Sequence, residues 1–148
     1  MTTTEAFQNL LIDSLSANAK LAPLAEAGQI RAVTDQADPK IGPAAIVVDV
    51  TDKGAHLGLP GRILLDFNAA VSVRTSLADD VDCSAYNTLI QGVEETLAAL
   101  PIDTAQTGGF TILHASAWHY AGLEVDGFYR YNSLTATFLI LNNPPNTP

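Results

Sequence analysis

Basic residues are scarce in this sequence, and their scarcity argues against one large class of functions. Lysine and arginine together number 7 against 16 acidic residues, so the formal net charge is −9. A protein that grips duplex nucleic acid neutralises phosphates with clustered Lys and Arg side chains. Here the basic residues are spread from Lys20 to Arg130 and form no patch in the sequence. We therefore expect no direct binding of nucleic acid.

Cysteine and long apolar runs are also nearly absent. The single Cys83 excludes an internal disulfide, and we interpret it as a small buried apolar side chain. No stretch reaches the roughly 18 consecutive apolar residues that a membrane-spanning helix needs. Residues 1–15 lack the basic start of a signal peptide. The sequence therefore predicts neither a membrane segment nor a secretory leader.

Charged residues of either sign make up only 16% of the chain, whereas hydrophobic residues make up 47%. Globular domains typically carry about 25% charged residues. A monomer of this size usually needs more charge to cover its surface, so we expect part of the surface to be buried against other subunits. The length of 148 residues suits one domain with its own core.

A long alternating segment followed by an amphipathic helix organises the rest of the chain. Apolar residues occupy the odd positions of residues 63–73, as in a strand with one buried face. An acidic turn follows, and over residues 86–100 the apolar side chains recur at helical spacing. Another helix is predicted over residues 2–16, where Thr2 and Glu5 have capping-box spacing.

The remaining segments alternate between strand and turn character. In chain order they are a helical turn at 21–27, an edge strand at 29–33, a buried strand at 44–50, a glycine-rich loop at 51–61, a strand at 110–120, a turn at 121–127 and a strand at 128–141. We predict a single α+β domain over residues 1–141, an antiparallel sheet with two main helices packed on one face and a long closing β-hairpin. Residues 142–148 are rich in proline and asparagine and are predicted to form a flexible tail.

No combination of residues has the spacing of a catalytic or metal site. His114 and His119 are five apart in one predicted strand, so their side chains would point to opposite faces and could not share a zinc ion. Asp79, Asp80 and Asp82 lack the spacing of a calcium loop, and we interpret Asp82 or a neighbour as the cap of the following helix. We expect no enzyme activity, no metal and no cofactor.

The order of these segments resembles the tail terminator family of long-tailed bacteriophages, the tail completion or minor tail protein U-like proteins. The first piece of the resemblance is the opening helix with Leu21-Ala22-Pro23-Leu24-Ala25 and the strand at 29–33. The second piece is the strand at 67–74 with its Asp-rich turn and the helix at 85–100. The closing hairpin is the third, so the likeness extends to about Leu141.

The resemblance implies a structural virion protein. Such terminators form a six-membered ring on the last ring of tail-tube subunits, stop tube growth and offer the surface to which the filled head attaches. The implied partners are further copies of this chain, the tail-tube protein and a head-completion or neck protein. DNA would pass through the lumen without specific binding, helped by acidic residues that repel phosphate. The implied location is the neck region of the virion tail, after assembly in the host cytoplasm.

Elimination of chemical sites leaves three regions as candidate contact surfaces. They are an arm within residues 53–62, the acidic turn, and the outward face of the hairpin. The candidate residues are Lys53, His56, Leu57, Leu59 and Arg62 in the arm, Asp79, Asp80 and Asp82 in the turn, and Tyr129 and Tyr131 on the hairpin.

Two other classes of function remain open. The protein could be another neck or tail component, such as a head-completion or tube protein with the same α+β build. It could instead be a small α+β enzyme or ligand-binding domain, with His114, His119 and Asp126 near one end of the hairpin. The second alternative predicts a deep pocket with convergent polar groups.

Overall fold

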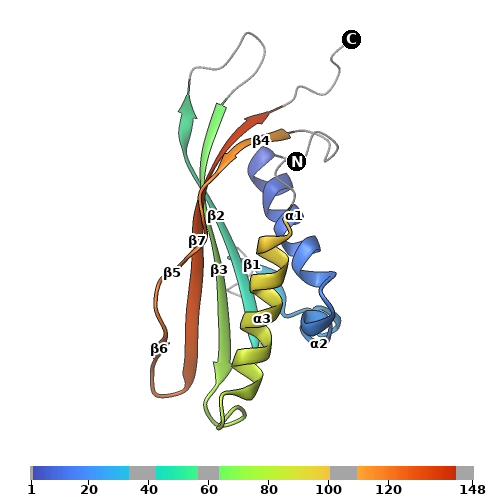
Figure 1. The fold of residues 1–148 in the computed structure, drawn as a ribbon, viewed down its shortest axis with the longest axis vertical. Coiled ribbons are helices and arrows are strands. Elements are labelled where there is room, and N and C mark those ends of the chain that lie inside the picture. The colour runs from blue at the N-terminus through green and yellow to red at the C-terminus, as the bar shows by residue number, and fades with distance from the viewer. Residues whose placement is uncertain (1, 34–42, 57–63, 101–109, 143–148) are drawn as a thin grey trace.

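The computed structural model describes residues 2–33, 43–56, 64–100 and 110–142 of the chain. Within these ranges the protein combines helices with one mixed sheet (Figure 1), which confirms the α+β class. The elements are α1 (Thr3–Ser16), the 3-10 helix η1 (Ala19–Leu21), α2 (Ala22–Glu26), β1 (Ile30–Ala32), β2 (Ala45–His56), β3 (Leu64–Ser76), α3 (Ser84–Ala98), β4 (Phe110–Ala115), β5 (His119–Tyr120), β6 (Glu124–Val125) and β7 (Tyr129–Asn142). None of the helices in these ranges is long and apolar enough to cross a membrane.

The strand order is β1-β2-β3-β7-β4, and β5 and β6 also pair with β7. Strand β7 therefore pairs with β3 on one side and with β4, β5 and β6 in succession on the other. The prediction of an antiparallel sheet is wrong at β1, which runs parallel to β2. After α2 the chain reaches the end of the sheet where β2 begins. There the Ile46 N–H donates to the Gln29 carbonyl (2.9 Å).

The two segments that organised the sequence form as predicted. The odd positions of β3, from Phe67 to Val73, are buried, and the even positions are half-buried or exposed. Helix α3 buries the face that carries its regularly spaced apolar residues. At the start of α1 the Glu5 N–H donates to Thr2 Oγ1 (3.1 Å) and the Thr2 N–H donates to Glu5 Oε2 (3.2 Å). The predicted capping box is therefore confirmed.

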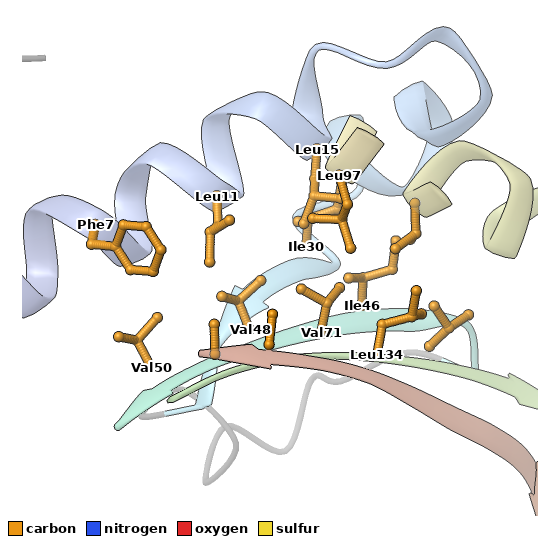
Figure 2. Packing of buried hydrophobic residues seen from close by; sticks show 14 of the residues in the cluster. Phe7, Leu11, Leu15, Ile30, Ile46, Val48, Val50, Val71, Leu97 and Leu134 are labelled. Atoms are coloured by element: carbon orange, nitrogen blue, oxygen red, sulfur yellow. The ribbon is translucent and has the colours of Figure 1, made fainter. Parts of the chain in front are cut away.

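The core lies between the helices and the sheet. Helix α1 contacts β1 and β2, α3 contacts β3, and the two helices contact each other. Phe7 of α1 brings its ring within 4.8 Å of Phe138, 5.7 Å of Phe67 and 6.0 Å of Phe110, measured between ring centroids. Figure 2 shows Phe7 and the α1 leucines above the valines of β2. One apolar stripe of α1 thus packs against side chains from β2, β3, β4 and β7.

The predicted loop at 51–61 is wrong in its first half. Strand β2 continues to His56, and its pairing with β3 is interrupted only between Asp52 and Ala55. Gly54 adopts a φ of +126° at this bulge, and its N–H donates to Asp52 Oδ1 (2.8 Å). A bulge absorbs the extra residue without ending the strand, so the glycine does not act as a stop. Residues 57–61 lie outside the described ranges.

The predicted strand at 110–120 is also divided, because β4 ends at Ala115 and β5 begins at His119. A register shift between Ile112 and His114 accompanies the division. The predicted turn at 121–127 contains the short strand β6. At the carboxyl end, β7 extends to Asn142, which the sequence assigned to the tail, and residues 143–148 lie outside the described ranges.

Candidate assembly surfaces

The acidic turn between β3 and α3 uses one of its carboxylates inside the protomer. Asp80 is only 3% exposed, and its carboxylate accepts the N–H groups of Ala85 and Tyr86 in the first turn of α3 (both 2.9 Å). Arg130 of β7 donates from Nη1 to Asp80 Oδ2 (3.1 Å) and to the Asp80 carbonyl (3.0 Å). The predicted capping of α3 is confirmed with Asp80 as its main acceptor, so this carboxylate is not free for an outside partner.

The other two acidic side chains of the turn are exposed. Asp82 Oδ1 accepts the Ser84 N–H (3.1 Å), and the hydrogen bonds from Ser84 lower the pKa of the Asp82 carboxyl. Burial alone would raise the pKa of Asp80, but the N–H donors of Ala85 and Tyr86 and the charge of Arg130 hold it below its ordinary value. The net lowering of both pKa values therefore keeps this end of α3 negatively charged, the sign that a helix N-terminus favours.

Cys83 occupies the N-cap position of α3 in a left-handed conformation with φ +69°. Within the described ranges it is the one non-glycine residue with a positive φ. The prediction of a buried thiol is wrong, because Cys83 is half-buried. Its left-handed backbone makes the sharp bend that connects the acidic turn to α3. The backbone conformation therefore determines how far this thiol is buried.

An apolar cluster that sequence reasoning missed lies beside the acidic turn. We call it the apolar tip; it consists of Val81, Leu123, Val125 and Phe128. Val81 is 81% exposed and Phe128 is 76% exposed, and the other two are more than half exposed. The Leu77 N–H donates to the Phe128 carbonyl (3.0 Å), so the β3–α3 turn and the β6–β7 turn are joined. Exposed apolar side chains gathered at one end of a molecule are typical of a contact surface.

The apolar tip is held in place by local hydrogen bonds. Asp126 Oδ1 accepts the N–H groups of Phe128 (2.8 Å) and Tyr129 (2.7 Å), and these bonds lower the pKa of the Asp126 carboxyl. A usable signal for the tip was present in the sequence. Val81 stands between two aspartates of a turn, where burial is not expected. Leu123 and Val125 lie in the segment 121–127, which we predicted to be a turn.

The two tyrosines predicted for the hairpin face are half-buried on the sheet face that points away from the core residues of β7. The guanidinium of Arg74 stacks over Tyr129, with Cζ 4.3 Å from the ring centroid. A hydrogen bond to Glu124 raises the pKa of the Tyr131 hydroxyl. Tyr129 and Tyr131 therefore form part of an ordered polar surface next to the apolar tip.

Small polar side chains line the rest of this outer sheet face. The hydroxyls of Ser72 and Ser133 lie 2.7 Å apart across β3 and β7. Farther along the strands lies a hollow of about 530 Å³. Its lining includes Asp49 of β2, His119 of β5 and Thr135 of β7. Such a surface offers hydrogen-bond donors and acceptors over a wide area.

The predicted arm is described only in part. Lys53 is exposed within the bulge of β2, and His56 is the last residue of that strand. Leu57, Leu59 and Arg62 lie outside the described ranges. The role of these three residues as a contact arm therefore stays a prediction.

The two hairpin histidines lie on the same face, contrary to the prediction. His114 pairs with Leu139 and His119 pairs with Thr135, both odd positions of β7. The register shift in β4 and the break before β5 remove the alternation that would have separated them. Their partners are nevertheless four positions apart in β7, roughly 13 Å along a strand, which is too far for a shared metal ion. Among the described residues no group of three potential metal ligands occurs.

Comparison with known proteins adds no assignment to these surfaces. The chain matches no family model and no curated protein. The proposed function therefore rests on the geometry and the chemistry of the exposed surfaces.

Proposed function

We propose that this protein is a ring-forming structural subunit of a long-tailed bacteriophage, which caps the tail tube, ends its polymerisation and provides the surface for head attachment. The observation that carries the proposal is the apolar tip, in which Val81 and Phe128 are largely exposed on a chain of low charge content. Burial of such side chains against a neighbour removes apolar area from water and stabilises an assembly.

The finer architecture is part of the same proposal. We propose that α1 and α3 pack on one face of the sheet and that β4 to β7 form the closing hairpin. The contacts of α1 with β2, of α3 with β3 and between the two helices support this arrangement. It would leave the outer sheet face and the apolar tip available for neighbouring subunits, the tail tube or the head-completion protein.

The net charge of −9 supports a passive role toward DNA. An acidic channel repels phosphate, so DNA could pass through the ring without binding to it. We propose that exposed carboxylates contribute to the channel wall, and that the protein has no enzymatic activity. A ring structure whose channel wall is predominantly basic would contradict this part of the proposal.

Polymerising tail tubes test the proposed cap directly. The protein is added to growing tubes of the tail-tube protein, and tube lengths are measured by negative-stain electron microscopy. Capping predicts that the mean tube length falls as protein is added and that ring-shaped density appears at tube ends. Tubes that grow equally long with and without a molar excess of the protein would refute it. Pull-down with the tube protein and with the head-completion protein then separates a terminator from another neck component.

The polar hollow on the outer sheet face favours a second candidate, a small ligand-binding domain. Asp49, His119 and Thr135 line it, and a volume of about 530 Å³ would hold a small polar molecule. This candidate predicts a monomer that does not bind the tail-tube protein. It also predicts that the ligand raises the melting temperature of the protein. Of the three residues named from the sequence for this alternative, His119 lines the hollow, whereas His114 and Asp126 do not.

A further inference from the structure

Contacts within the protomer make the apolar tip one continuous surface. Figure 1 shows β6 and the β3–α3 turn at the same end of the molecule. Val125 pairs with Arg130 across β6 and β7, so these two side chains point to the same side of the sheet. On that side Arg130 Nη1 donates to the carbonyl of Asp80 (3.0 Å), the residue directly before Val81. Val81 and Val125 therefore flank one buried ion pair.

The backbone of the tip is fixed before any partner binds. Asp126 Oδ1 accepts the N–H groups of Phe128 and Tyr129, and the Phe128 carbonyl accepts the Leu77 N–H. The side chain of Phe128 nevertheless stays largely exposed. A partner that covers it gains the burial of an aromatic side chain without first ordering the turn that carries it.

Carboxylates border these apolar side chains. Residues 74–83 and 123–131, which form the two turns and the adjoining strand ends, contain five acidic and two basic residues. Both basic side chains, Arg74 and Arg130, are engaged within the protomer. The exposed acidic side chains come from both turns and are Asp79, Asp82, Glu124 and Asp126. The apolar centre of the tip therefore has a rim with a net negative charge.

The charge of this rim disfavours two kinds of occupant. A second copy of the chain carries a net charge of −9. Of its lysines in the described ranges, Lys20 is paired with Glu95 and Lys53 is next to Asp52, so a copy would bring acidic surface against the rim. Anionic lipid headgroups would be repelled in the same way. The surface that fits the tip is apolar at its centre and basic at its edges.

We propose that the apolar tip binds a cationic amphipathic helix of another protein. The apolar stripe of this helix covers Phe128, Val81 and Val125, and lysines or arginines along both edges of the stripe face the carboxylates of the two turns. Phe128 is the aromatic anchor at the centre of the contact. The charges at the rim set the orientation of the helix. This inference rests on the proposed structural role and states the chemistry of the protein that the tip meets.

Two synthetic peptides of about 18 residues, roughly five helical turns, serve as probes. Both carry the same leucine stripe, which is flanked by lysines in the first peptide and by glutamates in the second. Fluorescence anisotropy of the labelled peptides, titrated with the full chain, measures the dissociation constants. The lysine peptide should bind at least about tenfold more tightly than the glutamate peptide at low salt, and high salt should reduce the difference. Equal binding of the two peptides, or no binding of the lysine peptide, would overturn the inference.

The variant Phe128→Ser tests the apolar centre of the contact. It should weaken binding of the lysine peptide about tenfold or more, because the buried aromatic side chain is lost. Leu113→Ser, at a 49% exposed position of β4, is the matched control and should bind within about twofold of the wild type. Near-ultraviolet circular dichroism verifies that both variants keep the native packing. A Phe128→Ser chain that binds as tightly as the wild type would refute the role of the tip.

A pair of double variants tests the rim separately from the overall charge. Asp79→Asn combined with Glu124→Gln removes two rim carboxylates, whereas Asp13→Asn combined with Glu26→Gln removes two exposed carboxylates of α1 and α2. Both double variants change the net charge by the same amount. The rim variant should weaken binding of the lysine peptide about fivefold at low salt, and the control should stay within about twofold. Equal weakening by both would show that the peptide responds only to the net charge.

The two disfavoured occupants are tested with the same Phe128→Ser variant. Sedimentation velocity of the chain alone measures self-association, and flotation with phosphatidylcholine vesicles that contain phosphatidylserine measures membrane binding. Neither should depend on Phe128. Oligomers of the wild type that dissociate in Phe128→Ser would assign the tip to a second copy. Vesicle binding that is lost in Phe128→Ser would assign it to a membrane, and either result would overturn the inference.

Tube growth separates this inference from the function on which it rests. Peptide binding that depends on Phe128, together with tube lengths that the protein does not change, would support the contact and reject the cap. Tubes that are shortened by a chain with no affinity for the lysine peptide would reject the contact and leave the cap intact.

Discussion

Asp80 and Arg130 form a buried ion pair that joins the β3–α3 turn to strand β7. The guanidinium Nη1 of Arg130 lies 3.1 Å from Asp80 Oδ2, and only 12% of its side chain is exposed. The same carboxylate accepts two N–H groups of α3. One buried carboxylate therefore satisfies donors from two elements, and it holds in place the turn that carries Val81 of the apolar tip.

Removal of this carboxylate should strongly destabilise the fold. In Asp80→Ala the guanidinium of Arg130 remains buried without its partner and two N–H groups of α3 lose their acceptor. The loss of one partner of a buried pair typically costs about 3–5 kcal/mol, which urea denaturation would measure as a lower free energy of unfolding. Asp79→Ala, at an exposed neighbouring position, should change stability by no more than about 0.5 kcal/mol. Equal stability of the two variants would disprove the role of Asp80.

The stability of the protein should fall under acidic conditions for the same reason. The folded state lowers the pKa values of Asp80, Asp82 and Asp126 below the ordinary 3.8. A carboxyl with a lowered pKa in the folded state contributes stability that is fully present above its unfolded pKa and is lost as the pH falls through the folded pKa.

We therefore expect a constant urea midpoint from neutral pH to about pH 5, and a decline that begins near pH 4 and continues below it. Because Asp80→Asn removes one of the three linked carboxyls, its decline should be shallower than that of the wild type. The control Asp79→Asn should follow the wild-type curve. An Asp80→Asn profile parallel to that of the wild type would show that this carboxyl is not linked to folding.

Strong local patterns explain what could be predicted from the sequence. The alternation of residues 63–73 corresponds to β3, the helical spacing after Tyr86 corresponds to α3, and the Thr2–Glu5 spacing gives a real capping box. In each case neighbouring residues alone carry the signal. The glycine-rich segment at 51–61 misled the prediction, because pairing with β3 carries β2 past Gly54 through a bulge.

The candidate contact surfaces were harder to predict because they depend on contacts between distant residues. The pairing of Asp80 with Arg130 spans fifty positions, and no local pattern distinguishes Asp80 from Asp79 or Asp82. The apolar tip was missed for a different reason. Sequence patterns treat an apolar residue as buried, so the exposure of Phe128 becomes visible only in the structure.

The conformation of Cys83 predicts a stabilising substitution. A left-handed conformation costs a residue with a Cβ about 1–2 kcal/mol, and glycine avoids this cost. Glycine also loses more chain entropy on folding, roughly 0.5–1 kcal/mol. Cys83→Gly should therefore raise the free energy of unfolding by up to about 1 kcal/mol, and Cys83→Val should lower it because a β-branched side chain tolerates this backbone poorly. Thermal unfolding of both variants checks the order, and a glycine variant less stable than the valine variant would contradict it.

An added methyl group at Gly92 of α3 should destabilise the fold. A Cβ at this position would lie 2.7 Å from Leu21 Cδ2 and 2.8 Å from Leu21 Cγ, in the fully buried contact of α3 with η1. Alanine in place of glycine favours an exposed helix by about 1 kcal/mol, whereas overpacking a core costs about 1–3 kcal/mol. The clash should dominate, because Leu21 is enclosed and its Cγ cannot move without η1. Gly92→Ala should therefore unfold at lower urea concentration than the wild type, whereas Gly127→Ala, where nothing lies within 4 Å, should not. A Gly92→Ala variant more stable than the wild type would mean that η1 is free to move away from α3.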